Sequence, residues 1–277
     1  MACTKKYFIR NKEIIDTKHF RISELENTTA LYEVVKINGG KALFFEDHIN
    51  RLRHSAKLSG KNIPWRDEEI SEQVERLVKL NEVKNGRLKF LFRYKNNRTP
   101  HFYTFFLKDI TPPDEYYTQG IKTVFFKAGR EQPGIKQIDY NLRRSVKSYI
   151  KERHAFEALF VNDKNLLTEG SKSNFFGIKQ NTVYTTPEEK VLPGITRAFV
   201  LKICREKNIP FTEKNIPYDS VHEFDSAFIS GTSIGILPVK TIEAADYSTK
   251  HPILQSIMKE YANITNKYLK TKQNMLT

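Results

Sequence analysis

Three short segments of this chain carry residues that could do chemistry together. GIK (Gly134–Lys136) places a lysine after a glycine, TEGSKSNFFGI (Thr168–Ile178) places Glu169 in a tight turn, and LPGITR (Leu192–Arg197) is typical of a helix start. A lysine amine can attack a carbonyl carbon once burial or a neighbouring cation has lowered its pKa. A helix start offers N–H groups that bind an anion. The three segments therefore predict amine chemistry on an anionic ligand.

Each of these residues has an ordinary alternative when it is considered alone. Lys136 is one of 46 Lys and Arg residues, and lysines are mostly exposed, so a single lysine carries little information. Glu169 stands among glycine and serine residues that are typical of a solvent-exposed turn. Asn174 is expected to have a structural role and to tie this turn to the next strand. Only the ordered combination of segments indicates a site.

The combination matches what a pyridoxal 5′-phosphate (PLP) site requires. Such a site needs a lysine for a Schiff base, a carboxylate opposite the pyridine nitrogen, and a cup of N–H groups and hydroxyls for the phosphate. Lys136 is the candidate for the Schiff base and for moving a proton between the α-carbon of a substrate and C4′ of the cofactor. Glu169 is the candidate carboxylate, because an ionised carboxylate keeps the pyridine nitrogen protonated and the ring an electron sink.

Five further residues are candidates for the phosphate cup and for a substrate carboxylate. The amide of Ile195 and both the amide and hydroxyl of Thr196 lie at the predicted helix start. Thr232 follows the strand SAFI and could contact the phosphate, while the amides of Thr232 and Ser233 could face a substrate carboxylate. Arg51 in HINRL offers a cation with a planar fork of donors. A helix cap, a plain turn and an exposed helix charge are the ordinary alternatives.

The net charge of +14 raises the alternative of a nucleic-acid partner. The basic residues are scattered along the chain, and their densest stretch is LRRSVKSYIKER (Leu142–Arg153). Leu142, Val146 and Ile150 stand there at helical spacing, so the basic residues are expected on the outside of a half-buried helix. A solvated helix face is therefore favoured, and no nucleic-acid partner is predicted.

Cysteine usage and hydropathy indicate the compartment. Cys3 and Cys204 cannot form a disulfide framework, and no CxxC pair indicates a zinc site, so a reducing compartment and no metal are predicted. The first residues, MACTKKYFIRNKEII, lack the apolar run of a signal peptide, and no apolar stretch reaches the length of about 18 residues that a membrane helix needs. These features predict a soluble, cytoplasmic protein with no membrane partner.

The first part of the chain predicts a mixture of strands and helices. LYEVVKIN (Leu31–Asn38) predicts a strand, and the Gly39-Gly40 turn that leads into ALFF is typical of a hairpin. Helical periodicity follows in HINRLRHSAKL and again from Ile70 to Val78. Three aromatic or branched runs predict one antiparallel sheet, namely Arg87–Tyr94, His101–Leu107 and Ile121–Phe126.

The segment KAGREQPG, residues 127–134, lacks periodicity and contains Gly and Pro, so it is the predicted interdomain connection. Beyond it, the pattern predicts helices near 139–155 and 252–269, a helix opened by Pro193-Gly194, and strands at 156–161, 173–178, 182–186 and 226–230. We therefore predict an α+β chain of two domains. A smaller N-terminal α/β domain (1–126) and a linker (127–134) precede a larger C-terminal domain (135–277) that carries Lys136 and most of the PLP site.

Taken in order, these motifs resemble the fold type IV PLP-dependent enzymes, the family of branched-chain aminotransferases, D-amino-acid aminotransferases and aminodeoxychorismate lyases. The resemblance covers nearly the whole chain, from LYEVVK and EDHINRL through GIK, TEGSKSNFF, TTP, LPGITR and SGTS to LPV. It implies the two-domain fold of a D-amino-acid aminotransferase, with Lys136 as the Schiff-base lysine and Glu169 as the partner of the pyridine nitrogen. It implies that Tyr140 lies near the phenolic oxygen of the cofactor. The implied phosphate contacts are Arg51, Ile195, Thr196 and Thr232.

Several positions indicate which branch of this family the chain resembles most. LYEVVK looks most like the D-amino-acid branch, in which a tyrosine such as Tyr32 helps to hold the substrate carboxylate. Arg98 and His101 in RTPH are loosely similar to the arginine and histidine carboxylate trap of that branch. ELENTTA (Glu24–Ala30) replaces the usual Asp-Arg-Gly or Gly-Asp-Gly turn, so the loop near the substrate entrance is expected to differ. Aminodeoxychorismate lyases commonly have a Thr-rich strand where Glu33-Val34 stands here, which favours transamination.

The resemblance implies a PLP-dependent aminotransferase that moves an amino group between an amino acid and a 2-oxo acid by a ping-pong mechanism. It also implies a homodimer, with small-molecule substrates as the other partners. The alternative within the family is a lyase that eliminates pyruvate from aminodeoxychorismate and leaves 4-aminobenzoate. The alternatives outside it are a basic nucleic-acid-binding protein and a relative that has lost catalysis.

Overall fold

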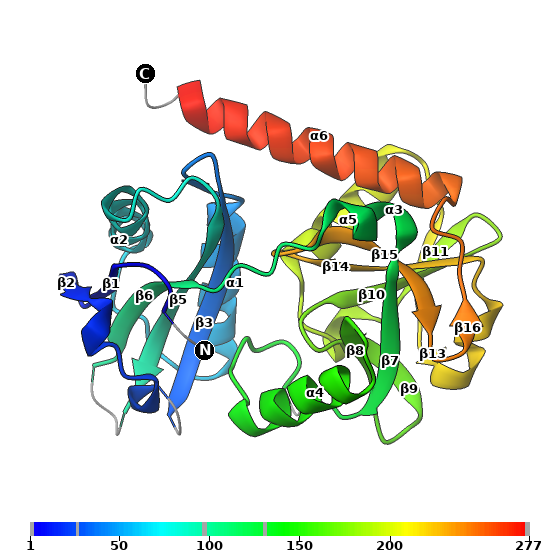
Figure 1. The fold of residues 1–277 in the computed structure, drawn as a ribbon, viewed down its shortest axis with the longest axis horizontal. Helices are drawn as coiled ribbons and strands as arrows, with labels where there is room; N and C mark the ends of the chain where they lie inside the picture. The colour runs from blue at the N-terminus through cyan, green and yellow to red at the C-terminus, as the bar shows by residue number, and fades with distance from the viewer. Residues whose placement is uncertain (1–2, 26–27, 96–98, 130–131, 275–277) are drawn as a thin grey trace. The chain divides into compact units, whose positions relative to one another are not determined.

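The computed structural model describes residues 3–25, 28–95, 99–129 and 132–274, which form two compact units (Figure 1). The first unit contains Met1–Ile110, Ile135–Ile138 and Thr265–Thr277, and the second contains Thr111–Gly134 and Asp139–Ile264. A segment of four residues around Lys136 and the C-terminal residues thus belong with the N-terminal part of the chain.

The first unit is built on a six-stranded antiparallel sheet with the order β2-β1-β6-β5-β3-β4. β3 (Thr29–Asn38) and β5 (Gly86–Tyr94) form its longest pair, and their register places Glu33 opposite Phe90. Branched and aromatic residues dominate both strands and suit a pleated, buried surface. The other strands are β1 (Tyr7–Arg10), β2 (Glu13–Asp16), β4 (Lys41–Ala42) and β6 (His101–Leu107), and the short 3₁₀ turns are Thr17–His19 and Ile22–Glu24.

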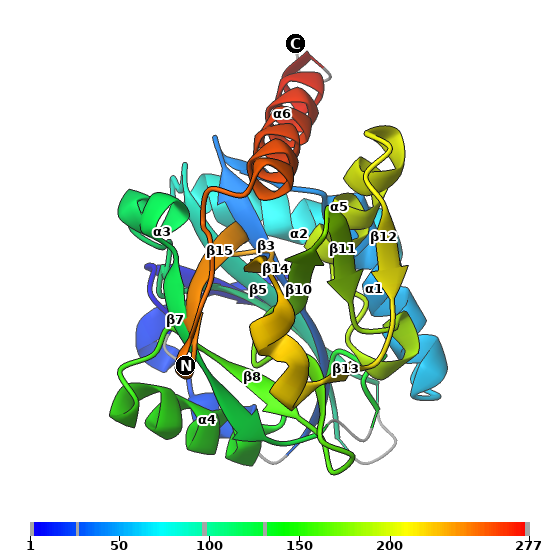
Figure 2. The same cartoon turned by 90° about the vertical axis from the view of Figure 1, so that its right-hand side faces the viewer.

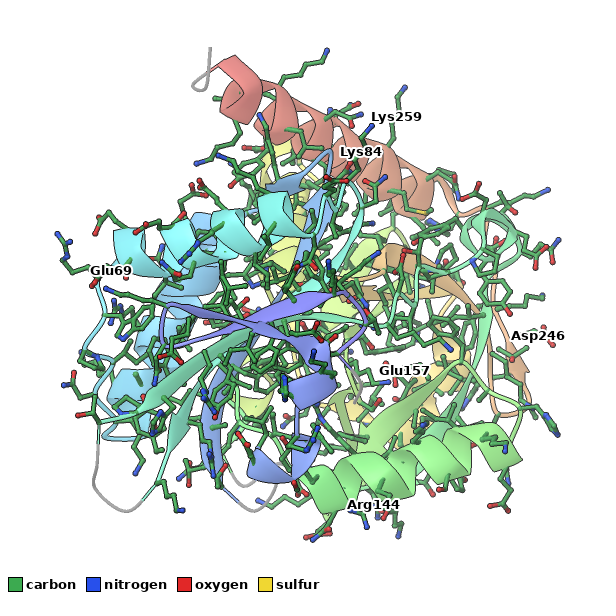
Figure 3. The ribbon with its side chains drawn as sticks, turned by 60° about the vertical axis from the view of Figure 1, so that its left-hand side comes forward. Glu69, Lys84, Arg144, Glu157, Asp246 and Lys259 are labelled. Atoms are coloured by element: carbon green, nitrogen blue, oxygen red, sulfur yellow. The ribbon has the colours of Figure 1, made fainter. Side chains whose placement is uncertain are left out.

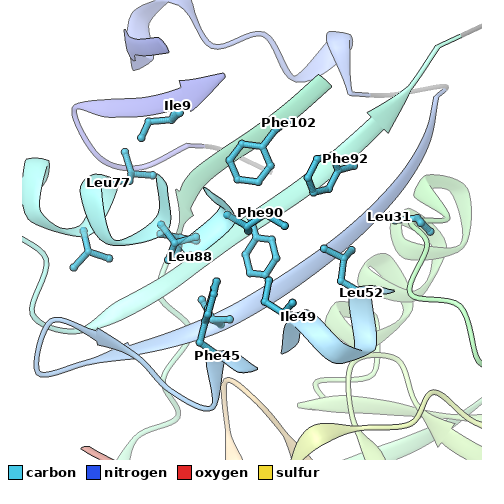
Figure 4. Packing of buried hydrophobic residues seen from close by; sticks show 14 of the residues in the cluster. Ile9, Leu31, Phe45, Ile49, Leu52, Leu77, Leu88, Phe90, Phe92 and Phe102 are labelled. Carbon is cyan, nitrogen blue, oxygen red and sulfur yellow. The ribbon is translucent and has the colours of Figure 1, made fainter. Parts of the chain in front are cut away.

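Two helices, α1 (Phe45–Leu58) and α2 (Asp67–Leu80), supply apolar side chains to the core of this unit. Figure 4 shows Ile49 and Leu52 of α1 beside Phe90 and Phe92 of β5. Ile49 and Leu52 are three positions apart, so they lie on one face of the helix. Burying each such side chain stabilises the unit by about 1.5–3 kcal/mol, which fixes α1 against the sheet.

The start of α1 is capped from the other end of the chain. Its N-cap residue Phe44 has a left-handed backbone (φ 52°) and makes no side-chain cap. The hydroxyl of Tyr268, in the C-terminal part of α6, instead accepts the Phe45 N–H (3.2 Å) and donates to Glu46 Oε2 (2.7 Å). The Phe44 and Tyr268 rings also pack with centroids 4.9 Å apart. The C-terminal residues therefore fix the helix on which His48 and Arg51 stand.

The second unit is built on a ten-stranded mixed sheet with the order β12-β11-β10-β14-β15-β7-β8-β9-β13, and β16 pairs with β15 (Figure 2). Its parallel pairs are β7 with β8, β7 with β15, and β11 with β12. The strands are β7 (Ile121–Lys127), β8 (Glu157–Val161), β9 (Leu166–Gly170), β10 (Asn174–Lys179), β11 (Thr182–Thr185), β12 (Phe211–Glu213), β13 (Ile216–Pro217), β14 (Ser226–Gly231), β15 (Gly235–Ile242) and β16 (Ala245–Asp246).

Helices pack on this sheet through apolar clusters. α5 (Ile195–Glu206) and the first part of α6 (Pro252–Asn274) pack near Phe176 and Phe228, whose rings stack with centroids 4.8 Å apart. α4 (Tyr140–Glu152) buries Val146 against β7 and β8, while its Arg144 is exposed (Figure 3). The prediction that the basic residues of this segment lie on the outside of a half-buried helix is confirmed for Arg144. The remaining short helices are α3 (Asp114–Gln119), Glu188–Lys190 and Tyr218–Glu223.

The α+β class is confirmed, but one predicted strand joins a different sheet. Ile121–Phe126 was expected to pair with the two preceding runs, and that prediction is wrong, because β7 pairs in parallel with β8 and β15 in the second unit. The observed boundary after Ile110 therefore differs from the predicted one at 126. Ile135–Ile138 also lies in the first unit, where Ile135 joins the core, and not with the rest of 135–277. Within the predicted linker, 127–134, Arg130 and Glu131 lie outside the described residues.

Candidate functional site

The backbone on both sides of Lys136 is fixed within the first unit. Its N–H donates to the Ser55 hydroxyl of α1 (3.2 Å), and its carbonyl accepts the Tyr32 N–H of β3 (3.2 Å). Leu31 and Gln137 form an isolated antiparallel bridge beside these bonds. Lys136 is thus held between a helix and a strand, and its Nζ lies 5.1 Å from the centroid of the Tyr32 ring. The structure therefore brings together two predicted site residues, Lys136 and Tyr32.

A second lysine approaches the same tyrosine ring. Lys89 lies on β5, is fully buried (0% exposed), and places its Nζ 4.2 Å from the Tyr32 ring centroid. The face of an aromatic ring attracts a cation at this distance. The sequence reasoning missed Lys89. The signal was a single lysine inside the apolar run LKFLF, where every residue from Leu88 to Phe92 is buried.

Arg51 meets a buried carboxylate in the first unit. Glu33 on β3 (0% exposed) accepts from Arg51 Nε at 2.8 Å and from its NH2 group at 2.6 Å. His48 Nδ1 lies 2.7 Å from the same carboxylate. Burial raises the pKa of Glu33, but the Arg51 charge and the hydrogen bonds from Arg51 and His48 outweigh it and lower this pKa to about 2. Burial is the main cause that lowers the pKa of His48.

This arrangement changes what Arg51 can offer to an anion. A two-point guanidinium–carboxylate contact fixes the orientation of both groups. Arg51 is therefore a rigidly placed cation whose charge is shared with Glu33, and the alternative of an exposed helix charge does not hold, because Arg51 is buried. Glu33 was considered in the sequence only as a mark of the family branch, so its role as the partner of Arg51 was missed.

Glu169 lies near the end of β9 in the second unit and is buried (3% exposed). Its Oε2 accepts the N–H of Leu192 at 3.1 Å. The side chain of Asn174, the first residue of β10, donates from Nδ2 to the carbonyl of Leu192 at 3.0 Å. Two buried polar side chains thus hold both polar backbone groups of one residue. The expectation that Asn174 ties its turn to the next strand is corrected, because its side chain reaches the segment before α5.

That segment leads into the helix start that was predicted to bind phosphate. Gly194 is the N-cap of α5, has no side-chain cap, and could not carry a Cβ, which would lie 2.0 Å from Asn174 Oδ1. Ile195 and Thr196 follow as buried residues, and the Thr196 hydroxyl lies 3.4 Å from the Tyr261 hydroxyl. The N–H groups of a first helical turn and the helix dipole favour an anion. Glu169 and the phosphate candidates Ile195 and Thr196 are therefore linked within one unit through Leu192.

Arg197 anchors the same helix turn from its other side. Its buried guanidinium donates to the carbonyl of Thr186 and to Glu188 Oε2, both at 3.1 Å, and also to Glu213. These contacts join α5 to the segments that follow β11 and to β12. A buried arginine with carboxylate partners resists displacement, because breaking one contact leaves an uncompensated charge. The position of the α5 start is therefore fixed by Arg197 and by Asn174.

The other predicted residues of the second unit lie at element ends. Thr232 and Ser233 are half-buried in the turn between β14 and β15. Ser230, at the end of β14, pairs with Asn174 in register, and among the described residues its buried hydroxyl has no hydrogen-bond partner. Tyr140 is the first residue of α4 and is half-buried. The cofactor contacts of these residues stay predictions.

Two predictions concerned residues near the substrate entrance. Arg98, expected to pair with His101, lies outside the described residues, as do Glu26 and Asn27 of the unusual entrance loop. His101 is exposed, and its Nδ1 lies 2.8 Å from Asn11 Nδ2.

In the described part of the chain, no His, Cys, Asp and Glu side chains cluster in a way that could hold a metal ion. Within the same residues, no helix has the length and apolar character needed to cross a membrane.

Comparison with known proteins identifies the family. The model of the family "Amino-transferase class IV" matches residues 30–242. The chain therefore belongs to the class IV aminotransferases, the PLP-dependent enzymes of fold type IV. A D-alanine aminotransferase of Bacillus licheniformis is 30% identical over 235 residues, which are 80% of this chain and 82% of that protein. The predicted family, enzyme class and cofactor are confirmed.

Solved structures show the same fold at lower sequence identity. The branched-chain amino acid aminotransferase of Escherichia coli matches with a TM-score of 0.85 and 19% identity, covering 95% of each chain. The PLP form of a branched-chain amino acid aminotransferase from Thermobaculum terrenum matches with a TM-score of 0.82 and 21% identity, also covering 95% of each chain. The predicted fold class, a two-domain fold type IV architecture, is confirmed.

The described residues fit the cofactor of this family. A half-buried lysine, a buried carboxylate and an uncapped helix start are present. No side chain caps the start of α5 at Gly194, so its first amides are available to an anion. The partnerless hydroxyl of Ser230 adds a polar group near Asn174.

Proposed function

We propose that this aminotransferase takes D-amino acids as amino donors, with D-alanine as the first to test. The observation that carries the proposal is the 30% identity to a D-alanine aminotransferase over most of both chains. Tyr32 beside Lys136 supports it, because a tyrosine at this position is what the resemblance to the D-amino-acid branch implies. The reaction is a ping-pong transfer of the amino group to a 2-oxo acid.

Lys136 is the residue proposed for covalent attachment and proton transfer. PLP, when bound, supplies an aldehyde carbon and a ring that accepts the electrons released at the substrate α-carbon. Lys136 would hold the cofactor through its side-chain amine and, when released from it, would carry the proton that leaves the substrate α-carbon. Ser55 and the backbone of Tyr32 hold the Lys136 backbone, so only the side chain has to move during this step.

Glu169 is proposed to hold the proton on the pyridine nitrogen. An ionised carboxylate gives a charge-assisted hydrogen bond, which is stronger in a buried environment than in water. The Leu192 N–H contact at 3.1 Å orients one oxygen of this carboxylate. The amides of Ile195 and Thr196 and the hydroxyls of Thr196 and Thr232 are proposed to bind the phosphate.

Arg51 and Tyr140 complete the proposed cofactor contacts. Arg51 is proposed to bind the phosphate from an orientation that Glu33 sets. Tyr140 is proposed to lie near the phenolic oxygen of PLP, as the resemblance implies.

The substrate carboxylate is proposed to bind near Tyr32, with the amides of Thr232 and Ser233 as further donors. The buried ammonium group of Lys89, 4.2 Å from the Tyr32 ring centroid, adds a positive charge that favours a carboxylate there. A screen of D- and L-amino acids with several 2-oxo acids tests the proposal. Turnover of D-alanine at least tenfold faster than L-alanine supports it, and a preference for L-amino acids refutes it.

The lyase alternative is decided in the same screen. A parallel assay with aminodeoxychorismate measures 4-aminobenzoate, which a transaminase does not form. A homodimer and a cytoplasmic location belong to the proposal as well, as the resemblance and the sequence led us to expect. Sedimentation equilibrium tests the dimer, because a monomer mass at micromolar concentration contradicts it.

A further inference from the structure

Glu157, which is labelled in Figure 3, is the first residue of β8 and binds a turn that no cofactor contact explains. Its carboxylate is buried (4% exposed) and accepts five hydrogen bonds. Oε1 accepts from the N–H of Ala158 (2.9 Å) and from both the N–H (3.2 Å) and the hydroxyl (2.5 Å) of Ser171. Oε2 accepts from the N–H of Lys172 (3.3 Å) and the hydroxyl of Ser173 (3.1 Å). Each of these five contacts places an N–H or O–H donor against a carboxylate oxygen.

The turn that Glu157 binds connects β9 to β10. Within it, the Gly170 N–H donates to the Ser173 carbonyl (2.7 Å), and the Ser171 N–H also donates to the Ala158 carbonyl (2.9 Å). A Cβ on Gly170 would lie 2.1 Å from the Ser173 hydroxyl and 3.2 Å from Glu157 Cγ. Only glycine allows the carboxylate and the turn to approach this closely. The Ser173 hydroxyl, which donates to Glu157, thus takes the space that a side chain at position 170 would need.

The two ends of this turn are the two residues that hold Leu192. Glu169 precedes Gly170 and accepts the Leu192 N–H, while Asn174 follows Ser173 and donates to the Leu192 carbonyl. A shift of the turn would move both side chains and would loosen Leu192. Since Leu192 lies two residues before Gly194, the N-cap of α5, the shift would also reach the helix start.

We propose that Glu157 is a positioning residue that fixes the turn Gly170–Ser173, so that Glu169 and Asn174 hold Leu192 and the start of α5 for the cofactor. The inference deepens the proposed function, because it relies on the roles given to Glu169 and to the α5 amides. Glu157 itself touches neither the reacting atoms nor the phosphate in this scheme. A carboxylate suits this positioning role because its two oxygens can accept from five donors at once.

The test is Glu157→Gln, which keeps the side-chain shape and removes one acceptor oxygen. The amide nitrogen that replaces Oε2 would face the N–H of Lys172, a contact between two donors. Hydrogen exchange of the cofactor-free protein should show faster exchange of the Lys172 and Leu192 amides, by at least about tenfold. Titration of the same protein with PLP should show an affinity about tenfold lower than that of the parent.

A matched control is Glu243→Gln. Glu243 in the second unit also accepts a backbone N–H, from Phe125 at 2.8 Å, and binds Arg153 at 2.8 Å, but it takes no part in the proposed site. This variant should leave Leu192 exchange and PLP affinity within about twofold of the parent. Ser171→Ala removes only the 2.5 Å hydroxyl contact and serves if Glu157→Gln does not fold. It should shift the same two measurements in the same direction, by about threefold.

The outcomes separate this inference from the proposed function. Leu192 exchange and PLP affinity within twofold of the parent in Glu157→Gln, or shifts equal to those of Glu243→Gln, overturn the inference. A parent protein that binds no PLP overturns the proposed function, and Leu192 exchange in the cofactor-free variants still decides the role of Glu157. Faster Leu192 exchange with unchanged PLP affinity also overturns the inference, because the turn would then not control the cofactor site.

Discussion

Replacing Glu33 by glutamine should destabilise the protein strongly at neutral pH, although the two side chains have nearly the same size and shape. Glu33 is fully buried between Arg51 and His48, and Arg51 is itself only 8% exposed. A glutamine has one acceptor oxygen where both carboxylate oxygens now accept from Arg51. The guanidinium would stay charged and would lose its counter-charge.

The magnitude follows from two independent estimates. Removing one partner of a buried ion pair costs about 3–5 kcal/mol. The pKa of Glu33 is lowered from 4.5 to about 2. A depression of that size corresponds to roughly 3 kcal/mol of stabilisation of the charged form. A loss of about 3 kcal/mol should lower the midpoint of thermal unfolding, Tm, by roughly 6–12 °C.

The pH dependence has a definite sign. The pKa of Glu33 is depressed in the folded protein, so its contribution is complete above about pH 4.5 and is lost as the pH falls towards 2. The difference in Tm between parent and Glu33→Gln should therefore be constant from pH 6 to 8 and should shrink below about 4.5. Burial lowers the pKa of His48, so protonation of His48 destabilises the fold on acidification in the parent as well.

Calorimetry of the cofactor-free protein at several pH values measures this difference. Because the chain has two units, the Tm of the transition that contains the first unit is compared, and not one free energy for the whole chain. Glu69→Gln is the control, since Glu69 forms an exposed ion pair with Lys12 at 2.7 Å and glutamine can replace it in the cap of α2. Its Tm should match that of the parent. A Glu33→Gln Tm within 2 °C of the parent at pH 7, or a difference that grows on acidification, would refute the reasoning.

The remaining predictions concern the proposed site. Borohydride reduction of the PLP-bound protein should fix the cofactor to Lys136, and a peptide map with the adduct on another lysine would remove Lys136 from its role. Glu169→Gln should retain PLP but slow the half-reaction with an amino donor about tenfold to a hundredfold, and an unchanged single-turnover rate would exclude the proposed contact. Arg51→Ala should weaken PLP binding by about 1.5–3 kcal/mol, which is more than the effect of Thr196→Ala, and turnover of both variants should largely recover at saturating PLP. Equal affinities in titrations of the two cofactor-free variants would contradict this. Lys89→Met should raise KM for the amino donor about tenfold while PLP affinity changes less than about twofold, and an unchanged KM would exclude Lys89 from substrate binding.

Local motifs predicted the elements that carry the site. Helical spacing located α1 and α4, and Gly194 before Ile195 and Thr196 predicted the start of α5. These features depend on residues within one or two helical turns, so a single sequence contains the signal. The pairing of β7 was not predictable in the same way. A strand rich in aromatic and branched residues fits either sheet, and its partners are set by packing at long range.

Residues that act through burial were harder to recognise than residues in motifs. Lys89 stands in a strand buried on both faces, so no alternation of polar and apolar positions marks the side to which it points. Glu33 and Arg51 are 18 positions apart on a strand and a helix, and their contact depends on how α1 packs against β3. Glu157 precedes the turn it binds by more than a dozen residues, and only the pairing of β8 with β9 brings the two together.

The link between Glu169 and α5 shows why part of the site leaves almost no trace in a sequence. Glu169 and Asn174 bind the N–H and the carbonyl of Leu192, not its side chain. Every residue carries a backbone carbonyl, and every residue except proline carries the N–H, so this requirement excludes only one residue type at position 192. A sequence motif can reveal only residues whose side chains make the contacts. The positioning of the phosphate candidates depends instead on peptide groups, and these become visible only when the strands that carry Glu169 and Asn174 are placed in space.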